Sequence, residues 1–118
     1  MVDKLNNICK DLDRLYDANS GFCALIAYNL SKFFELNNIQ YKTKTYYYDK
    51  ECDCPYHYSL IVDNVEINKS DIKGYSKIYE NKNSDYFLRI HNLLMYKASS
   101  YRKNKEQLIE KYIKDSIF

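Results

Sequence analysis

Apolar side chains recur at two different spacings along this chain, and the change of spacing constrains the fold more than any other feature. Over residues 3–16 and 22–37 they recur every three or four positions, which is typical of an amphipathic helix. From residue 39 to 48 the period shortens to two, and the β-branched and aromatic residues there favour a strand. Residues 84–98 and 105–117 return to the helical spacing. The sequence therefore predicts helices at both ends and a sheet between them.

Two more strands are predicted at residues 56–62 and 65–68, because the turn formers Asp63 and Asn64 separate two β-prone runs. If these two residues form the loop, Val62 faces Val65 and Leu60 faces Ile67, and the apolar side chains of this hairpin share one face. Residues 70–79 are ambiguous, and we interpret them as a helical turn that stops near Gly74. We expect a single α+β domain over residues 1–118 with a small antiparallel sheet.

Composition narrows the classes of protein that this chain can belong to. Hydrophobic residues make up 46% and charged residues 29% of the 118 positions, which excludes wholesale disorder. A net charge of +2 is too balanced for a dedicated nucleic-acid binder. Because no apolar run reaches the roughly 18–20 residues of a membrane span and the N-terminus lacks signal-peptide features, we expect a cytoplasmic protein without membrane contact. The chain is tyrosine-rich, with 14 Tyr and no Trp, and AT-rich codon usage explains most of that excess.

Cys23 and His57 are the strongest candidates for chemistry. Cys23 falls in the first turn of the second predicted helix, where free backbone N–H groups and the helix dipole favour a thiolate. Asn19 or Ser20 is the expected N-cap of that helix. His57 opens a predicted strand and can accept the thiol proton and return it to a leaving group. In the non-catalytic alternative, Cys23 is a small core residue and His57 is a polar residue whose hydrogen bonds are satisfied.

A third residue is needed to orient the imidazole, and the predicted hairpin register supplies Asn68. The register places Asn68 opposite Ser59 and diagonal to His57 on the same face of the hairpin. Diagonal Cβ atoms lie about 5.5–8 Å apart, within reach of a side-chain amide. In the alternative interpretation, Asn68 simply begins a turn.

Three segments resemble the papain-like and transglutaminase-like cysteine peptidase superfamily, including its NlpC/P60 branch. They are residues 21–27 at a helix start, 57–62 as a strand and 65–68 on the next strand, so the match is limited to residues 19–68. The resemblance implies a papain-like minimal core with Cys23 as nucleophile, His57 as base and Asn68 as orienting residue. Ala24 stands where many members have Trp, and Asn19 is the nearest substitute for their oxyanion-binding glutamine. The implied activity is cleavage or transfer of an acyl or amide group of a peptide or protein substrate, without a cofactor.

Two alternatives compete with this enzyme hypothesis. Cys52, Cys54 and His57 lie within six residues and would supply three ligands of a zinc site, in which case His57 could not act as the base. The lysines and tyrosines of residues 41–48 would form the contact surface of a non-catalytic protein-binding or inhibitory module, of the kind carried by phages and mobile elements. The same strand would also suit nucleic acid, or be an edge strand blunted by lysines. His91, alone within a helical stripe, is expected to pack.

Overall fold

The computed structural model describes residues 1–118 except residue 52. Its elements follow one another as two helices, four strands and two helices, which confirms the predicted α+β class. They are α1 (Val2–Tyr16), α2 (Cys23–Leu36), β1 (Lys42–Tyr47), β2 (Pro55–Val62), β3 (Val65–Ile67), β4 (Tyr75–Tyr79), α3 (Ser84–Met95) and α4 (Ser100–Ile117). None of the helices in the described part of the chain is long and apolar enough to cross a membrane.

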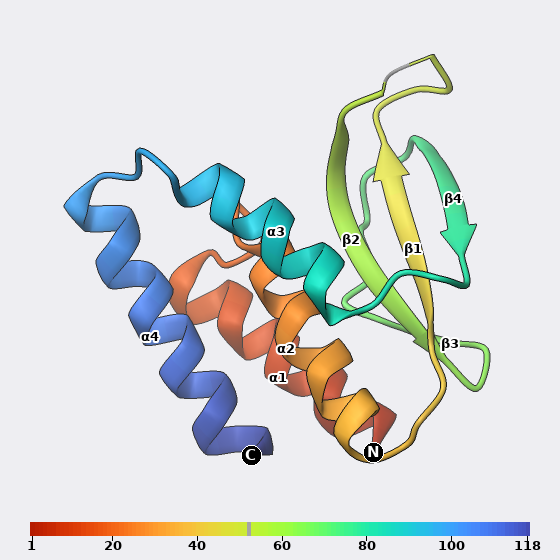
Figure 1. Ribbon diagram of the computed structural model, residues 1–118, viewed down its shortest axis with the longest axis horizontal. Coiled ribbons are helices and arrows are strands. Elements are labelled where there is room, and N and C mark those ends of the chain that lie inside the picture. The colour runs from red at the N-terminus through yellow and green to blue at the C-terminus, as the bar shows by residue number, and fades with distance from the viewer. Residues whose placement is uncertain (52) are drawn as a thin grey trace.

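The helices form one layer beside the sheet, and α2 lies at the centre of the molecule (Figure 1). The strands are antiparallel neighbours in the order β3-β2-β1-β4. Helix α2 packs against β2 on one side and α3 on the other, whereas α1 contacts β3 and α4. The start of α2 is therefore held close to β2, the strand that carries His57.

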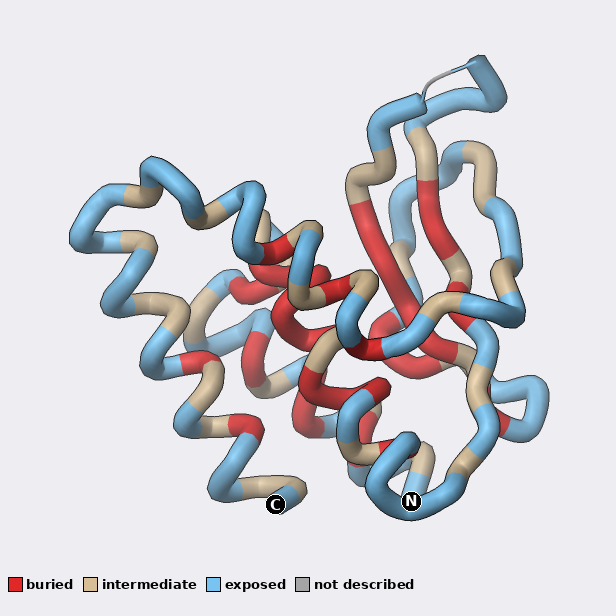
Figure 2. Tube along the Cα trace, viewed as in Figure 1, coloured by how far each residue is buried: buried red, intermediate tan, exposed pale blue. Residues whose placement is uncertain are grey.

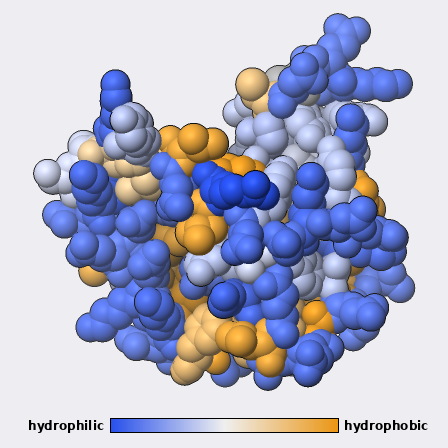
Figure 3. All heavy atoms as spheres, viewed as in Figure 1, coloured by the Kyte–Doolittle hydropathy of each residue, from blue (hydrophilic) through white to orange (hydrophobic). Residues whose placement is uncertain are grey.

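Burial is concentrated on α2 and β2, as Figure 2 shows. Removing such apolar side chains from water stabilises the fold by about 1.5–3 kcal/mol each, before the cost of ordering them. The largest fully buried side chains are Phe22, Phe34, Phe87, Leu12, Leu25, Ile26, Leu60, Ile67, Ile109, Ile113, His91 and Val62. Helix α3 buries Phe87 and His91 and leaves Leu94 54% exposed. Hydrophobic surface over α3 is visible in Figure 3.

The β2–β3 hairpin has the predicted register, with Val62 opposite Val65 and Leu60 opposite Ile67. Its loop residues Asp63 and Asn64 have φ angles of 51° and 65°. Two consecutive positive φ angles are the signature of the turn whose twist matches that of the two strands. The strand β3 ends at Ile67, one residue before the predicted end.

The segment before α3 is a strand, so the prediction of a helical turn in residues 70–79 is wrong for β4. Strand β4 pairs with β1 from Thr43 to Tyr47 and makes β1 an interior strand, which also overturns its interpretation as an edge strand. Gly74 makes this pairing possible: a Cβ atom there would lie 2.4 Å from the Tyr47 carbonyl oxygen. The alternation of β4 is too short and too exposed to be distinguished by its apolar pattern, because only five residues form it.

Candidate functional site

The candidate site lies at the edge of β2 that β3 leaves uncovered. Strand β3 pairs with β2 only between Leu60 and Val62, so the earlier part of β2 has no partner strand on that side. Cys23, the first residue of α2, fills the gap, and its Sγ donates to the Tyr56 carbonyl oxygen at 3.9 Å. The end of a helix thus meets the edge of a strand one residue before His57.

The surroundings of the Cys23 thiol act on it in two directions. Cys23 is only 6% exposed, and burial raises its pKa above the ordinary value of a thiol. The backbone N–H groups of Tyr58, Ala24 and Cys23 itself lower it. The N–H groups of Cys23 and Ala24 are the donors that the sequence predicted at the helix start, whereas that of Tyr58 comes from β2 and was not predicted.

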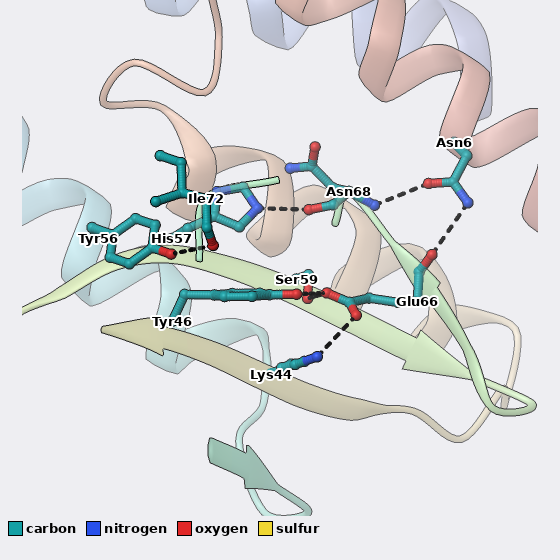
Figure 4. A network of polar contacts seen from close by, with 9 residues as sticks. All are labelled: Asn6, Lys44, Tyr46, Tyr56, His57, Ser59, Glu66, Asn68 and Ile72. Atoms are coloured by element: carbon teal, nitrogen blue, oxygen red, sulfur yellow. Dashed lines mark hydrogen bonds and ion pairs between the residues drawn. The ribbon is translucent and has the colours of Figure 1, made fainter. Parts of the chain in front are cut away.

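A bulge in β2 brings Tyr56 and His57 to the same neighbour. Tyr46 of β1 faces His57, whereas the next residue, Tyr47, faces Pro55, so Tyr56 has no opposite residue. The Tyr46 ring contacts both side chains, with centroid distances of 6.1 Å to Tyr56 and 5.5 Å to His57. Bulges commonly redirect side chains next to functional sites. Figure 4 shows the resulting group.

The ring of His57 is fixed by the backbone of Asn68. Its Nε2 lies 2.6 Å from the Asn68 carbonyl oxygen, and His57 is 4% exposed. Because a carbonyl oxygen only accepts, Nε2 carries the proton and the lone pair of the neutral ring is on Nδ1. Burial lowers the pKa of His57 below its ordinary value, opposed by the Asn68 carbonyl and by the charges of Glu66 and Asp13.

The side chain of Asn68 points to a different partner from the one we predicted. Its carboxamide exchanges two hydrogen bonds with that of Asn19, at 3.1 and 3.2 Å, and the carbonyl takes the place of the amide on His57. The reason is the left-handed φ of 66° at Asn68, which ends β3 and turns this residue out of the hairpin register. Asn6 holds the turn by accepting from the Asn68 N–H at 3.0 Å.

Asn19 is tied into the site and does not cap α2. The N-cap position belongs to Phe22, which makes no side-chain cap, so the prediction of Asn19 or Ser20 as N-cap is wrong. The backbone N–H of Asn19 donates to Asp13, and its carboxamide is the partner of Asn68. Both carboxamides line a cavity of about 240 Å³, whose walls are Asn6, Cys9, Lys10, Asp13, Asn19, Asn68, Lys69 and Asp71.

The structure thus brings all four predicted site residues to one edge of β2, through a chain of neighbouring contacts. Cys23 contacts the residue before His57, His57 contacts Asn68, and Asn68 contacts Asn19. Within the described residues, no hydrogen bond joins the Cys23 thiol to His57. The Nδ1 atom of His57 likewise has no hydrogen-bond partner among the described residues. It is not fully enclosed by the protein.

The zinc alternative depends partly on Cys52, which lies outside the described residues. Cys54 is exposed in the β1–β2 connection. Among the described residues there is no group of three potential metal ligands. His57 also has its Nε2 directed at the Asn68 carbonyl oxygen, which leaves only Nδ1 for any other partner.

Sequence reasoning missed the polar residues on the face of the sheet beside His57. Glu66 of β3 accepts from Ser59 of β2 at 2.7 Å and from the hydroxyl of Tyr46 of β1, and it forms an ion pair with Lys44. The period of two in this strand places Lys44 and Tyr46 on one face of β1. The pairing of β1 with β2 was the missing information, because a long connection leaves that register undetermined.

Compared with known proteins, the chain matches no family model, no curated protein and no solved structure.

Proposed function

We propose that the chain is a thiol-dependent enzyme that cleaves or transfers an acyl or amide group of a peptide or protein substrate. Cys23 is the nucleophile and His57 the general base. The resemblance to papain-like cysteine peptidases suggests this reaction, and the single observation that best supports it is the orientation of His57. Its protonated Nε2 faces a carbonyl, so the basic lone pair is on the other nitrogen.

The environment of His57 suits a base at neutral pH. Because burial lowers its pKa below the ordinary value, the ring is neutral at pH 7 and can accept a proton. The accepting atom is Nδ1, which makes no hydrogen bond to a described residue. The imidazolium that forms would be held by the Asn68 carbonyl at Nε2.

Burial raises the pKa of the Cys23 thiol, so in this proposal Cys23 depends on His57 to take its proton. In the proposed step, Sγ loses its proton to Nδ1 of His57 and adds to the substrate carbonyl carbon. The tetrahedral oxyanion takes a hydrogen bond from the Cys23 N–H, the leaving amine takes the proton from His57, and an acyl-thioester remains. Water or a second amine then takes the acyl group. The N–H groups of Tyr58 and Ala24 stabilise the thiolate during proton transfer.

A non-catalytic binding module is the second candidate, favoured by a different observation. Cys23 and His57 are 6% and 4% exposed, and the 240 Å³ cavity beside them is lined by neither. A closed thiol of this kind also suits a core residue. In this candidate the contact surface includes exposed Tyr48, which stacks on Tyr56 at 4.4 Å.

Alkylation of the thiols separates the two candidates. Cys9 is a matched internal control, because it is 3% exposed and its pKa is raised by burial to about 12, without any histidine contact among its described neighbours. A Cys52→Ser, Cys54→Ser background removes the loop thiols, and iodoacetamide incorporation is followed by mass spectrometry at pH 7. We expect Cys23 to react at least about tenfold faster than Cys9.

The control variants show whether His57 causes the difference. His57→Gln, checked for folding by its circular dichroism and melting temperature, should bring the two rates together. His91→Gln removes the other histidine and should leave the ratio unchanged. Equal rates for Cys9 and Cys23 in the Cys52→Ser, Cys54→Ser background with His57 intact would overturn the enzyme proposal and favour the binding module.

A further inference from the structure

A partly buried carboxylate, that of Glu66, lies on the same face of the sheet as His57 and is held by three side chains from two strands. The Glu66 side chain is 15% exposed, and one of its oxygens accepts from Ser59 at 2.7 Å and from the Tyr46 hydroxyl. Its other oxygen lies 3.3 Å from Nζ of Lys44. Burial raises the pKa of Glu66, but these hydrogen bonds and the lysine charge outweigh burial, so the pKa is below its ordinary value. Glu66 is therefore a fixed negative charge at neutral pH.

Two groups connect Glu66 to His57 on this face. The Tyr46 ring, whose hydroxyl donates to Glu66, stands edge-on to the imidazole with the ring planes at 62°. Ser59 lies two residues after His57, so both side chains leave β2 on the same face. Figure 4 shows the imidazole above this group and the carboxylate beside it.

The backbone of the Glu66 segment is also linked to the carbonyl that holds His57. Asn6 of α1 donates to the Glu66 carbonyl oxygen at 3.3 Å and accepts from the Asn68 N–H at 3.0 Å. One side chain thus spans both ends of the turn that presents the Asn68 carbonyl to Nε2. Glu66 and the orienting carbonyl belong to one hydrogen-bonded unit.

The charges that face His57 come from several elements. Asp13 lies on α1, and Glu66 lies on β3 with its ion-pair partner Lys44 on β1. The carbonyl at Nε2 is neutral. A proton moving from Cys23 to His57 would create a thiolate and an imidazolium, and negative charge near the ring favours the imidazolium.

We propose that Glu66 is a positioning residue that stabilises the imidazolium form of His57, through a charge held in place by Tyr46, Ser59 and Lys44. The proposal rests on the proposed function in assigning His57 as the base. Its electrostatic content is separate, because the protonation of His57 can be measured without substrate. Lys44 has the opposite influence, since it partly neutralises Glu66.

Two variants that remove opposite charges from one ion pair test this role. In Glu66→Gln the amide still accepts from Tyr46 and Ser59 but carries no charge, so the pH at which His57 is half protonated should fall by about half a unit to one unit. In Lys44→Met the carboxylate is left uncompensated, and the same midpoint should rise by a similar amount. Nuclear magnetic resonance of the ring protons measures both, and the chain's other histidine, His91, serves as the reference.

A purely structural network gives a different result. Loosening it by either substitution would move the His57 midpoint in the same direction or leave it unchanged, and either outcome overturns the proposal. Opposite shifts of His57 together with equal alkylation of Cys9 and Cys23 would support the electrostatic role and reject the enzyme. The failure of one proposal is therefore distinguishable from the failure of the other.

Discussion

The two histidines occupy regions that are equally buried and differ in what faces the ring. His57, at the β2 edge, is 4% exposed and directs Nε2 at a backbone carbonyl. His91, between α3 and α4, is 2% exposed and directs Nε2 at the Glu106 carboxylate. The Nδ1 atom of His91 is fully enclosed and has no hydrogen-bond partner, whereas the Nδ1 atom of His57 is not fully enclosed.

Burial alone therefore does not identify a functional histidine. His91 packs against Phe22 at a centroid distance of 6.1 Å and links α3 to α4 through Glu106, so its contacts serve the core. His57 has a nitrogen with an unused lone pair one residue from a thiol contact. The accessibility of Nδ1 therefore distinguishes His57 from His91.

The largest expected effect comes from Phe22, which joins the two regions. Its ring is fully buried, contacts His91, and lies 4.7 Å beneath the Arg102 guanidinium, while Cys23 is the next residue. Phe22→Ala should lower the free energy of unfolding by about 3–5 kcal/mol, because it empties a closed site. Chemical denaturation measures the loss.

A matched control uses an aromatic side chain on the surface of α4. Tyr101 is 74% exposed, so Tyr101→Ala should change stability by less than about 0.5 kcal/mol. If Phe22→Ala had as small an effect, Phe22 would not be part of a core shared by the His57 and His91 regions.

The fold could be predicted from the sequence where a pattern was local. The α1 and α2 stripes and the two-residue turn at Asp63 and Asn64 each depend on neighbours in the chain, and they are confirmed. Strand β4 was missed because its pairing with β1 depends on a distant carbonyl that only Gly74 can approach. Non-local backbone contacts leave no periodic trace in the sequence.

The second prediction concerns His91 itself. His91→Ala removes a ring enclosed by Phe22 and Glu106, and we expect a loss of about 2–4 kcal/mol in unfolding free energy. The alkylation ratio of Cys23 to Cys9 should stay unchanged in the folded protein, because no described contact links His91 to the thiol. A change in that ratio would show that the α3–α4 region influences the site, and would remove the distinction between the two histidines.

For the site, the sequence predicted that His57 and Asn68 meet, but not which of their atoms do. The predicted hairpin register correctly placed Asn68 near His57, because it follows from counting residues along the paired strands. It assumed that the strand continued through Asn68, and the positive φ there exchanges the roles of the side chain and the carbonyl. The backbone conformation of Asn68 therefore determines that its carbonyl oxygen, and not its side chain, contacts His57.

The last and smallest effect follows from that exchange. Asn68→Gly keeps the carbonyl and tolerates the left-handed φ, but loses the carboxamide that pairs with Asn19. Stability should fall by about 1 kcal/mol for the lost hydrogen bonds. If the carbonyl orients His57, the alkylation ratio of Cys23 to Cys9 changes little. If the side-chain amide is needed, the ratio falls to that of His57→Gln.

Asn68→Ala is the companion variant, since its Cβ disfavours φ of 66° and should disturb the carbonyl as well. Retained reactivity in Asn68→Gly with reduced reactivity in Asn68→Ala would assign the orientation of His57 to the backbone.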